Sequence, residues 1–233
     1  LVPNIINTIK SHGDSVATVM LGGVNYYTGQ KYDMKEISKV SNEIGAYVGF
    51  DLAHAAGNVK LDLHNWNVDF AAWCNYKYLN SGPGSPSGIF IHNKHSEWSG
   101  PRLAGWWGNS MDSCCTMDSN FDPIKGAEGW QLSNAAVLGM AAHLASLQIF
   151  KEAGMNRIGQ KRDQITAYLE FLLEDLNKKD QGFGKMGRYG FGLYMSSISQ
   201  CRRTDIFTWQ KDMMLKSWLD IDEIIDSEDD AKP

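Results

Sequence analysis

The chain alternates short apolar runs with segments whose apolar residues recur at helical spacing. An apolar run from Val16 to Leu21 ends in two glycines and has the composition of a strand buried on both faces. Asp33 then resembles a helix N-cap, because Glu36 follows it by three residues as in a capping box. Gly45 supplies the stop signal of that helix. The apolar positions between cap and stop are Met34, Ile37, Val40 and Ile44.

Three more strands follow from the same pattern. Residues 46–51 predict a second strand, and residues 68–74 predict a third. A strand, a helix and a strand in succession form a βαβ unit, in which the two strands lie parallel. After a loop rich in Gly, Pro and Ser, residues 88–91 predict a fourth, short strand. The predicted fold class is α/β, a mainly parallel sheet flanked by helices.

The second half of the chain changes character. Residues 92–132 show no clear period, and a loop of that length inside a compact domain is usually functional. We expect Ser133 to cap an Ala-rich helix that runs to about Ala153, with Gly154 as its stop. Residues 158–179 predict a further helix. Beyond it, the pattern deteriorates into Gly-rich and mixed sequence.

Composition and charge narrow the class of protein. The chain has 233 residues, of which 43% are hydrophobic and 21% charged, as in an ordinary packed protein and unlike disordered or collagen-like chains. The net charge is -5, but seven acidic groups and no basic one lie between Asp220 and Asp230. Without them, 20 acidic residues face 22 basic ones, so the remainder carries +2. A near-neutral body without a basic stripe argues against nucleic acid as a partner, and the acidic end is typical of a solvated tail.

The chain carries no targeting or membrane signal that we can identify. The apolar runs are shorter than the roughly 20 residues that a membrane span needs. The sequence starts at Leu1 without Met and without a basic stretch before an apolar one, which is expected of a piece of a longer protein and not of a signal peptide. The cysteines form no CxxC pair and no zinc-finger spacing with His, so we expect no metal site, and reduced thiols in a cytoplasmic protein. They are Cys74, Cys114, Cys115 and Cys201.

Ionisable residues stand at two predicted strand ends, where open parallel sheets bind ligands. Asp51 closes the second strand, and Lys77 follows the third strand between two tyrosines. A lysine among aromatic side chains is costly to keep charged, and a neutral amine is suited to a Schiff base. Pyridoxal phosphate (PLP) enzymes need such a lysine and a carboxylate that keeps the pyridine nitrogen protonated. The alternatives are a lysine that extends to water and an aspartate that favours a turn.

Five segments strongly resemble the kynureninase family, in matching order and spacing over residues 1 to about 178. They are residues 21–30 (LGGVNYYTGQ), 49–58 (GFDLAHAAGN), 76–80 (YKYLN), 105–108 (GWWG) and 132–134 (LSN). The resemblance implies a PLP-dependent enzyme of the aspartate aminotransferase fold type, fold type I. It also implies a homodimer, of which this chain contains an incomplete large domain.

The resemblance also implies an activity and a set of site residues. The family hydrolyses L-kynurenine to anthranilate and L-alanine, and 3-hydroxykynurenine to 3-hydroxyanthranilate, in tryptophan catabolism. Lys77 is similar to the lysine that binds the cofactor covalently and shuttles protons, and Asp51 to the partner of the pyridine nitrogen. The other positions that match cofactor-site residues are His54, the phosphate-binding Tyr76, Trp106 and Asn134.

The chain departs from the family at both ends. The family's phosphate-binding Thr loop and ring-stacking aromatic residue precede Leu1, and its substrate-binding arginine has no recognisable counterpart. We therefore divide the chain into residues 1–180, part of a PLP-binding large domain, and residues 181–233, a divergent or truncated segment with the acidic tail. Residues 182–187 fit G-x-G-x-x-G, but they follow a helix where a dinucleotide site needs a strand.

Three functions stay open from the sequence. The first is a PLP hydrolase of the kynureninase type, and the second is a non-catalytic truncated fragment able only to pair with a partner chain. The third is another PLP enzyme of the same fold, such as a cysteine desulfurase or an aminotransferase-like lyase. The segments GVNYYTGQ and GWWG argue against this third function.

Overall fold

The computed structural model describes residues 2–26, 29–114, 116 and 119–179, so the Gly-rich motif at 182–187 and the acidic tail lie outside the described residues. The chain divides into two compact units, residues 1–25 with 30–182, and residues 26–29 with 183–233. The elements of the first unit are α1 (Val2–His12), η1 (Gly13–Ser15), β1 (Thr18–Gly22), α2 (Met34–Glu43), β2 (Tyr47–Asp51), β3 (Phe70–Cys74), β4 (Ser87–Ile91), η2 (Asn93–His95), η3 (Trp106–Gly108), η4 (Ala127–Trp130), α3 (Val137–Ala153) and α4 (Met155–Lys179).

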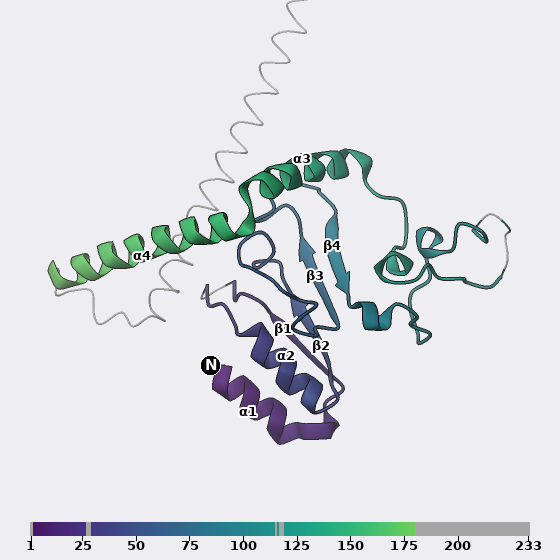
Figure 1. Cartoon of the computed structure of the whole chain (residues 1–233), viewed down its shortest axis with the longest axis horizontal. Coiled ribbons are helices and arrows are strands. Elements are labelled where there is room, and N and C mark those ends of the chain that lie inside the picture. Colours follow the sequence, from purple (N-terminus) through teal and green to yellow (C-terminus); the bar gives the residue numbers. More distant parts are fainter. Residues whose placement is uncertain (1, 27–28, 115, 117–118, 180–233) are drawn as a thin grey trace, which may run out of the picture. The chain divides into compact units, whose positions relative to one another are not determined.

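The four strands form one sheet in the order β1-β2-β3-β4. The pairs β1–β2 and β2–β3 are parallel, whereas β3–β4 is antiparallel; Figure 1 shows the opposite directions of the β3 and β4 arrows. Gly22 pairs with Asp51, and Asp51 pairs with Ala72, so the carboxyl ends of β1, β2 and β3 meet at one edge. The predicted α/β fold with a mainly parallel sheet is confirmed, and this edge is where the predicted chemistry lies.

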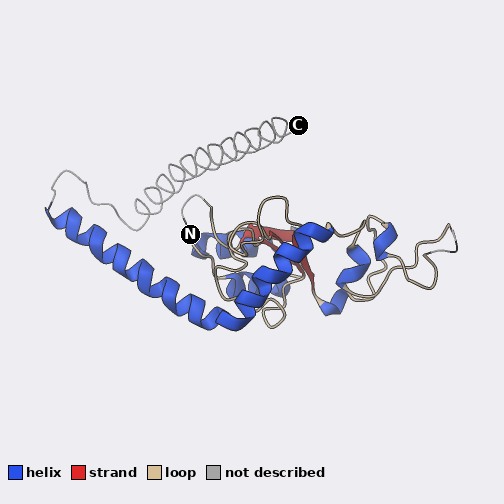
Figure 2. Cartoon of the chain, turned by 90° about the horizontal axis from the view of Figure 1, so that it is seen from above, coloured by secondary structure: helices blue, strands red, loops and turns tan. Residues whose placement is uncertain are grey.

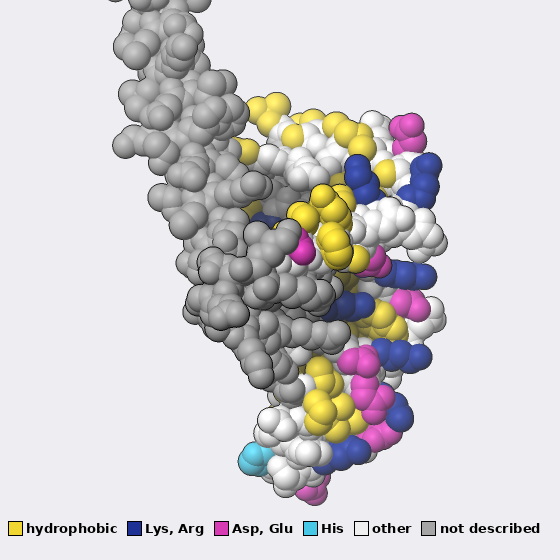
Figure 3. Space-filling view, turned by 90° about the vertical axis from the view of Figure 1, so that its left-hand side faces the viewer, with side chains coloured by type: hydrophobic (Ala, Val, Ile, Leu, Met, Phe, Trp, Pro, Cys, Tyr) yellow, Lys and Arg dark blue, Asp and Glu magenta, His cyan; other side chains and the backbone are white. Residues whose placement is uncertain are grey.

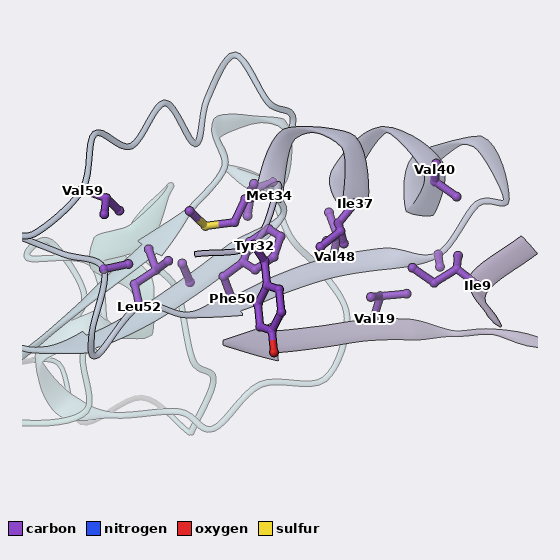
Figure 4. Close-up of a cluster of buried hydrophobic side chains, with 14 of the residues drawn as sticks. Ile9, Val19, Tyr32, Met34, Ile37, Val40, Val48, Phe50, Leu52 and Val59 are labelled. Atoms are coloured by element: carbon purple, nitrogen blue, oxygen red, sulfur yellow. The ribbon is translucent and has the colours of Figure 1, made fainter. Parts of the chain in front are cut away.

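Helix α2 forms the core with one face of the sheet. The Asp33 side chain accepts a hydrogen bond from the Glu36 N–H at 3.1 Å, as the capping-box pattern predicts. The apolar side chains of α2, Met34, Ile37 and Val40, are at most 1% exposed. Figure 4 shows Ile37 beside Val48 of β2, and Val48 and Phe50 are fully buried. The periodicity of apolar residues therefore identified the buried face of this helix.

The other face of the sheet is partly exposed among the described residues. In β1, Val19 is buried but Met20 is 58% exposed, and Tyr47 and Ile89 are exposed on the neighbouring strands. The prediction that the first strand is buried on both faces is therefore wrong. A continuous apolar run shows that a strand is apolar on both sides, but it does not show that something covers both sides.

The start of α3 also differs from the sequence prediction. The helix begins at Val137, and its N-cap Ala136 makes no side-chain capping bond, so Ser133 lies ahead of the helix and does not cap it. Its end agrees with the prediction, because Gly154 has φ 76° and separates α3 from α4. Figure 2 shows the resulting bend between the two consecutive helices.

The described surface has mixed charge. Figure 3 shows acidic and basic side chains interspersed over the described part of one face. Within the described residues, no helix combines the length and the apolar character that crossing a membrane requires.

Candidate active site

Asp51 stands at the carboxyl end of β2 with an exposed side chain. Its Oδ1 accepts a hydrogen bond from the Ala53 N–H at 2.9 Å, and this bond turns the chain away from the sheet. The side chains of Leu52 and Ala55 are fully buried in the core and hold the turn in place. Because the apolar residues of the turn point into the core, His54 between them lies half-buried at the carboxyl edge.

Lys77 lies in the loop after β3 and contacts the His54 turn. Strand β3 ends at Cys74, and the Lys77 Nζ in the following loop lies 2.9 Å from the His54 Nε2. Two protonation states satisfy this contact: an ammonium donates to a neutral imidazole, or a neutral amine accepts from the Nε2–H. The structure therefore brings a primary amine and an imidazole into contact, at the sheet edge where Asp51 ends β2.

The tyrosines beside Lys77 do not enclose it. Tyr76 is 52% exposed and Tyr78 is 42% exposed, while Lys77 is half-buried. The Lys77 Nζ lies 6.0 Å from the centroid of the Tyr76 ring, at the limit of a cation–π contact. The His54 and Tyr78 rings meet edge to face, with centroids 5.9 Å apart. The two tyrosines therefore flank Lys77 and leave it half-buried.

A glycine keeps the His54 turn against the Lys77 loop. Gly57 has φ +78°, and a Cβ at this position would lie 2.9 Å from the Tyr78 carbonyl carbon. The left-handed conformation and the close backbone approach both require glycine there. Gly57 belongs to the family motif at residues 49–58. Its role is to let the backbone of the His54 turn approach the backbone at Tyr78.

Trp106 and Asn134 belong to a second cluster. A Cβ added to Gly105 would lie 2.3 Å from the Leu132 Cα, so the segments before Trp106 and Asn134 touch through their backbones. Trp106 is 58% exposed and Asn134 is exposed. Neither side chain is hydrogen-bonded to Lys77 in the part of the chain that the structure describes. The structure thus joins these two segments to each other but not to the Lys77 edge.

At the opposite edge of the sheet, Asp69 forms a buried ionic cluster that the sequence reasoning missed. Its Oδ1 lies 2.7 Å from both the Lys94 Nζ and the His95 Nε2, and its Oδ2 accepts from the Val48 N–H at 2.7 Å. Burial by itself raises the pKa of Asp69, but the bonds to Lys94, Val48 and His95 outweigh it and hold this pKa below its ordinary value. The sequence did contain a signal for this cluster, because Asp69 is an acidic residue within the otherwise apolar predicted strand at residues 68–74.

The remaining His, Cys, Asp and Glu side chains form no cluster like that of Asp69 among the described residues. No three His, Cys, Asp or Glu side chains of the described residues are grouped so that they could hold a metal ion. The His64 and His92 rings stack with centroids 4.6 Å apart, and burial lowers the pKa of His92. The Cys74 Sγ lies 4.0 Å from the Ala53 carbonyl oxygen, and the Cys114 Sγ lies 3.5 Å from the Met111 carbonyl oxygen.

Comparison with known proteins defines the class. The model of the Aminotransferase class-V family matches residues 5–181, and the chain belongs to this family. Kynureninases are among the relatives that it matches. The chain is 55% identical over 180 residues to kynureninase from Flavobacterium psychrophilum, covering 77% of this chain and 42% of that protein. It is 53% identical over 175 residues to kynureninase from Dictyostelium discoideum, covering 73% and 39%. The chain thus spans less than half the length of these relatives.

Solved structures agree on the fold. An apo cysteine desulfurase from Thermococcus onnurineus NA1 matches with a TM-score of 0.56 at 19% identity, covering 76% of this chain and 42% of that one. An alanine–glyoxylate aminotransferase from Nostoc sp. matches with a TM-score of 0.55 at 20% identity, covering 75% and 44%. At these identities the likeness shows the class-V aminotransferase fold alone, so the fold type inferred from the sequence is confirmed.

A second family model overlaps the end of the first. The model of histidine kinase-, DNA gyrase B- and HSP90-like ATPases matches residues 154–232, less than half of the chain. Of this range, the described residues form α4, which the class-V match also covers. The Gly-rich motif at 182–187 falls within the second match and outside the described residues.

Proposed function

We propose that this chain is the part of a kynureninase that carries the cofactor-binding lysine, Lys77. The reaction is the hydrolysis of L-kynurenine to anthranilate and L-alanine, and of 3-hydroxykynurenine to 3-hydroxyanthranilate and L-alanine. The observation that carries the proposal is the 2.9 Å contact between the Lys77 and His54 side chains, at the sheet edge where Asp51 ends β2, in a chain 55% identical to a kynureninase. We favour it over the truncated, non-catalytic fragment because these residues are all present at one sheet edge.

The side chains at this edge fit pyridoxal phosphate. A half-buried primary amine on Lys77 is available for covalent attachment, and the Asp51 carboxylate is available for a protonated ring nitrogen. The Asp51 Oδ1 is occupied by the Ala53 N–H, whereas its Oδ2 has no hydrogen-bond partner among the described residues. When bound, PLP supplies an electron sink for the pair of electrons released by carbon–carbon bond cleavage.

Each residue of the chain then has a distinct task. The Lys77 Nζ would hold the cofactor and would be the group that moves a proton to or from the substrate. The Asp51 carboxylate would favour a proton on the ring nitrogen, because a carboxylate favours the charged form of a neighbouring base. His54 orients the Lys77 amine by the contact that it already makes. The exposed Tyr76 hydroxyl binds the cofactor phosphate.

We also propose a homodimer in the cytoplasm, with kynurenine as the small-molecule substrate and no nucleic acid or membrane partner. In this dimer Trp106 and Asn134 complete the site of the other copy. Their exposure in the single chain supports this arrangement, since residues that serve a neighbouring subunit are not buried against their own. The interspersed charges on the described face support the absence of nucleic acid, because a nucleic-acid site needs a basic patch.

The domain boundary stays at residue 180 in this proposal. Residues 1–180 form the incomplete PLP-binding large domain, and residues 181–233 are a divergent or truncated segment. The support is that the class-V match stops at residue 181, while the ATPase match continues to residue 232.

The test adds PLP to the purified chain and follows the absorbance band of its Schiff base. Borohydride then fixes the cofactor, and mass spectrometry locates it on a peptide. We expect the label on Lys77, its loss in Lys77→Arg, and no change in the control Lys60→Arg, which alters an exposed lysine. Anthranilate released from kynurenine is measured by its fluorescence.

The two readouts separate the candidate functions. No label on Lys77 at saturating PLP would refute the proposal and favour the non-catalytic fragment. A label without anthranilate would limit the chain to cofactor binding and place the missing step in the substrate-binding residues. A label together with anthranilate would establish the activity in this chain.

A further inference from the structure

Helix α3 contacts the Lys77 loop through two side chains that the proposed cofactor site does not use. The loop comprises residues 75–86, between β3 and β4. The Ser146 Oγ donates a hydrogen bond to the Leu79 carbonyl, two residues after Lys77. The His143 Nδ1 lies 2.7 Å from the Oγ of Ser81, which is only 3% exposed. Both contacts are partly buried, and a hydrogen bond is stronger where water is partly excluded.

The loop is closed on itself, so that a shift at one point reaches Lys77. The Asn80 N–H donates to the Lys77 carbonyl, and the Ser81 N–H donates to the Asn75 carbonyl, each at 3.1 Å. The buried Asn75 side chain donates to the Pro86 carbonyl at 2.6 Å. These bonds join the start, the middle and the end of the loop. A residue that holds Leu79 or Ser81 therefore also holds Lys77.

The protonation of the His143 Nδ1 determines which group accepts the hydrogen bond of the Ser81 hydroxyl. Ser81 has one hydroxyl proton, and it has two neighbours, the His143 Nδ1 at 2.7 Å and the Leu79 carbonyl at 3.3 Å. If the His143 Nδ1 carries a proton, it donates to the Ser81 Oγ, and Ser81 is free to donate to Leu79. If it does not, Ser81 donates to His143. The contact between helix and loop persists in both cases.

Helix α3 holds the loop on one side, and the His54 turn limits it on the other. The close approach of Gly57 to the Tyr78 carbonyl carbon, 2.9 Å for an added Cβ, fixes the second side. Lys77 lies between these two supports, with its Nζ on His54. The position of its amine is therefore set by tertiary contacts and not by the loop sequence alone.

We propose that His143 and Ser146 are positioning residues for Lys77. Through Ser81 and the Leu79 carbonyl, they hold the loop so that the Lys77 amine stays at the carboxyl edge of the sheet, beside His54. This inference rests on the proposed function, which makes Lys77 the residue that attaches PLP. Its test measures the Lys77 amine directly and does not depend on turnover of kynurenine.

The experiment compares two isosteric variants of His143 in the full chain. In His143→Asn the side-chain amide nitrogen lies near the position of Nδ1, whereas in His143→Gln it lies near Nε2 and the contact with Ser81 is lost. Two probes report on Lys77, each read by peptide mass spectrometry. They are PLP followed by borohydride, and trinitrobenzenesulfonate, which modifies any accessible amine.

We expect opposite responses from the two probes. In His143→Gln and in Ser146→Ala, PLP attachment slows by roughly two- to tenfold, the effect of losing about one net hydrogen bond. Modification by trinitrobenzenesulfonate rises by roughly twofold or more, since the amine leaves His54. His143→Asn restores both rates. The control His12→Ala, at an exposed histidine of α1, changes neither.

Each outcome decides one of the two proposals. Unchanged Lys77 labelling by both probes in His143→Gln and Ser146→Ala would overturn the positioning role. A parallel loss of labelling and of the far-UV circular dichroism signal, without rescue by His143→Asn, would also overturn it in favour of a purely structural contact. Failure of PLP to label Lys77 in the unmodified chain refutes the proposed function, while the trinitrobenzenesulfonate rates still decide the positioning role.

Discussion

Replacing Asp69 by asparagine tests the buried ionic cluster at the edge opposite the candidate site. The Asp69 side chain is 5% exposed, and its two oxygens receive the Lys94 ammonium, the His95 ring and the Val48 N–H. Asparagine is the matched replacement, because its amide keeps the shape of the side chain and retains one acceptor for Val48. What the substitution removes is the negative charge and one acceptor.

The magnitude follows from these contacts. Removing one partner of a buried pair costs about 3–5 kcal/mol when the other charge stays buried. The Lys94 side chain is 31% exposed and can turn towards water, which lowers the cost. We therefore expect Asp69→Asn to reduce the free energy of unfolding by about 2–3 kcal/mol at pH 7.

The assay is urea unfolding of both proteins over a range of pH. The pKa of Asp69 is lowered in the folded state, so its stabilising effect is fully present above the ordinary value of 3.8 and is lost as the pH falls further. The difference between the two proteins should therefore be constant near neutral pH and shrink below that value. The Asp69→Asn protein should lack the loss of unfolding free energy that protonation of Asp69 causes in the unmodified chain.

The matched control is the exposed pair of Glu97 and Lys125, whose side chains are 73% and 76% exposed at an N–O distance of 2.6 Å. Lys125→Ala should leave the unfolding midpoint unchanged, since solvent screens such a pair. Equal midpoints for Asp69→Asn and the unmodified chain at pH 7 would refute the reasoning, and so would a difference that grows as the pH falls.

Three further substitutions test the core and its connections by chemical denaturation. Gly57→Ala should lower the free energy of unfolding by about 2–3 kcal/mol, from its φ of +78° and the close Tyr78 carbonyl, and no loss would show that the loop can move away. Asp33→Ala should cost about 1 kcal/mol by removing the α2 cap, and an unchanged midpoint would contradict that role. Ile37→Ala should cost about 3 kcal/mol, against at most about 0.5 for Leu138→Ala, because Ile37 is fully buried and Leu138 is 88% exposed. Similar losses at both positions would contradict the assignment of the core.

The sequence predicted those features that local patterns determine. The cap at Asp33, the buried face of α2 and the order of the first three strands depend on neighbours within a few turns of the chain. The placement of Asp51 and of the start of the Lys77 loop at one sheet edge followed from the parallel arrangement, since parallel strands bring their carboxyl ends to one edge.

Tertiary contacts determined the features that the sequence did not predict. Ser133 has the right residue type for a helix cap, but it lies next to Leu132, whose backbone touches Gly105. This contact holds the segment outside the helix, and α3 begins four residues later at Val137. The contacts of Asp69 with Lys94 and of His143 with Ser81 join positions that no local pattern relates. The tasks of Asp51, His54, Tyr76, Lys77, Trp106 and Asn134 remain predictions.

The contact of α3 with the Lys77 loop sets the order in which a ribosome can complete this edge of the sheet. Each strand pairs with the strand before it, so the sheet grows as the chain emerges. The anchors of the loop come much later, because His143 lies 62 residues after Ser81 and Ser146 lies 67 residues after Leu79. During synthesis the Lys77 amine therefore exists for some time on a sheet that is already formed but without its support from α3. Productive capture of a cofactor would therefore wait until α3 has been synthesised.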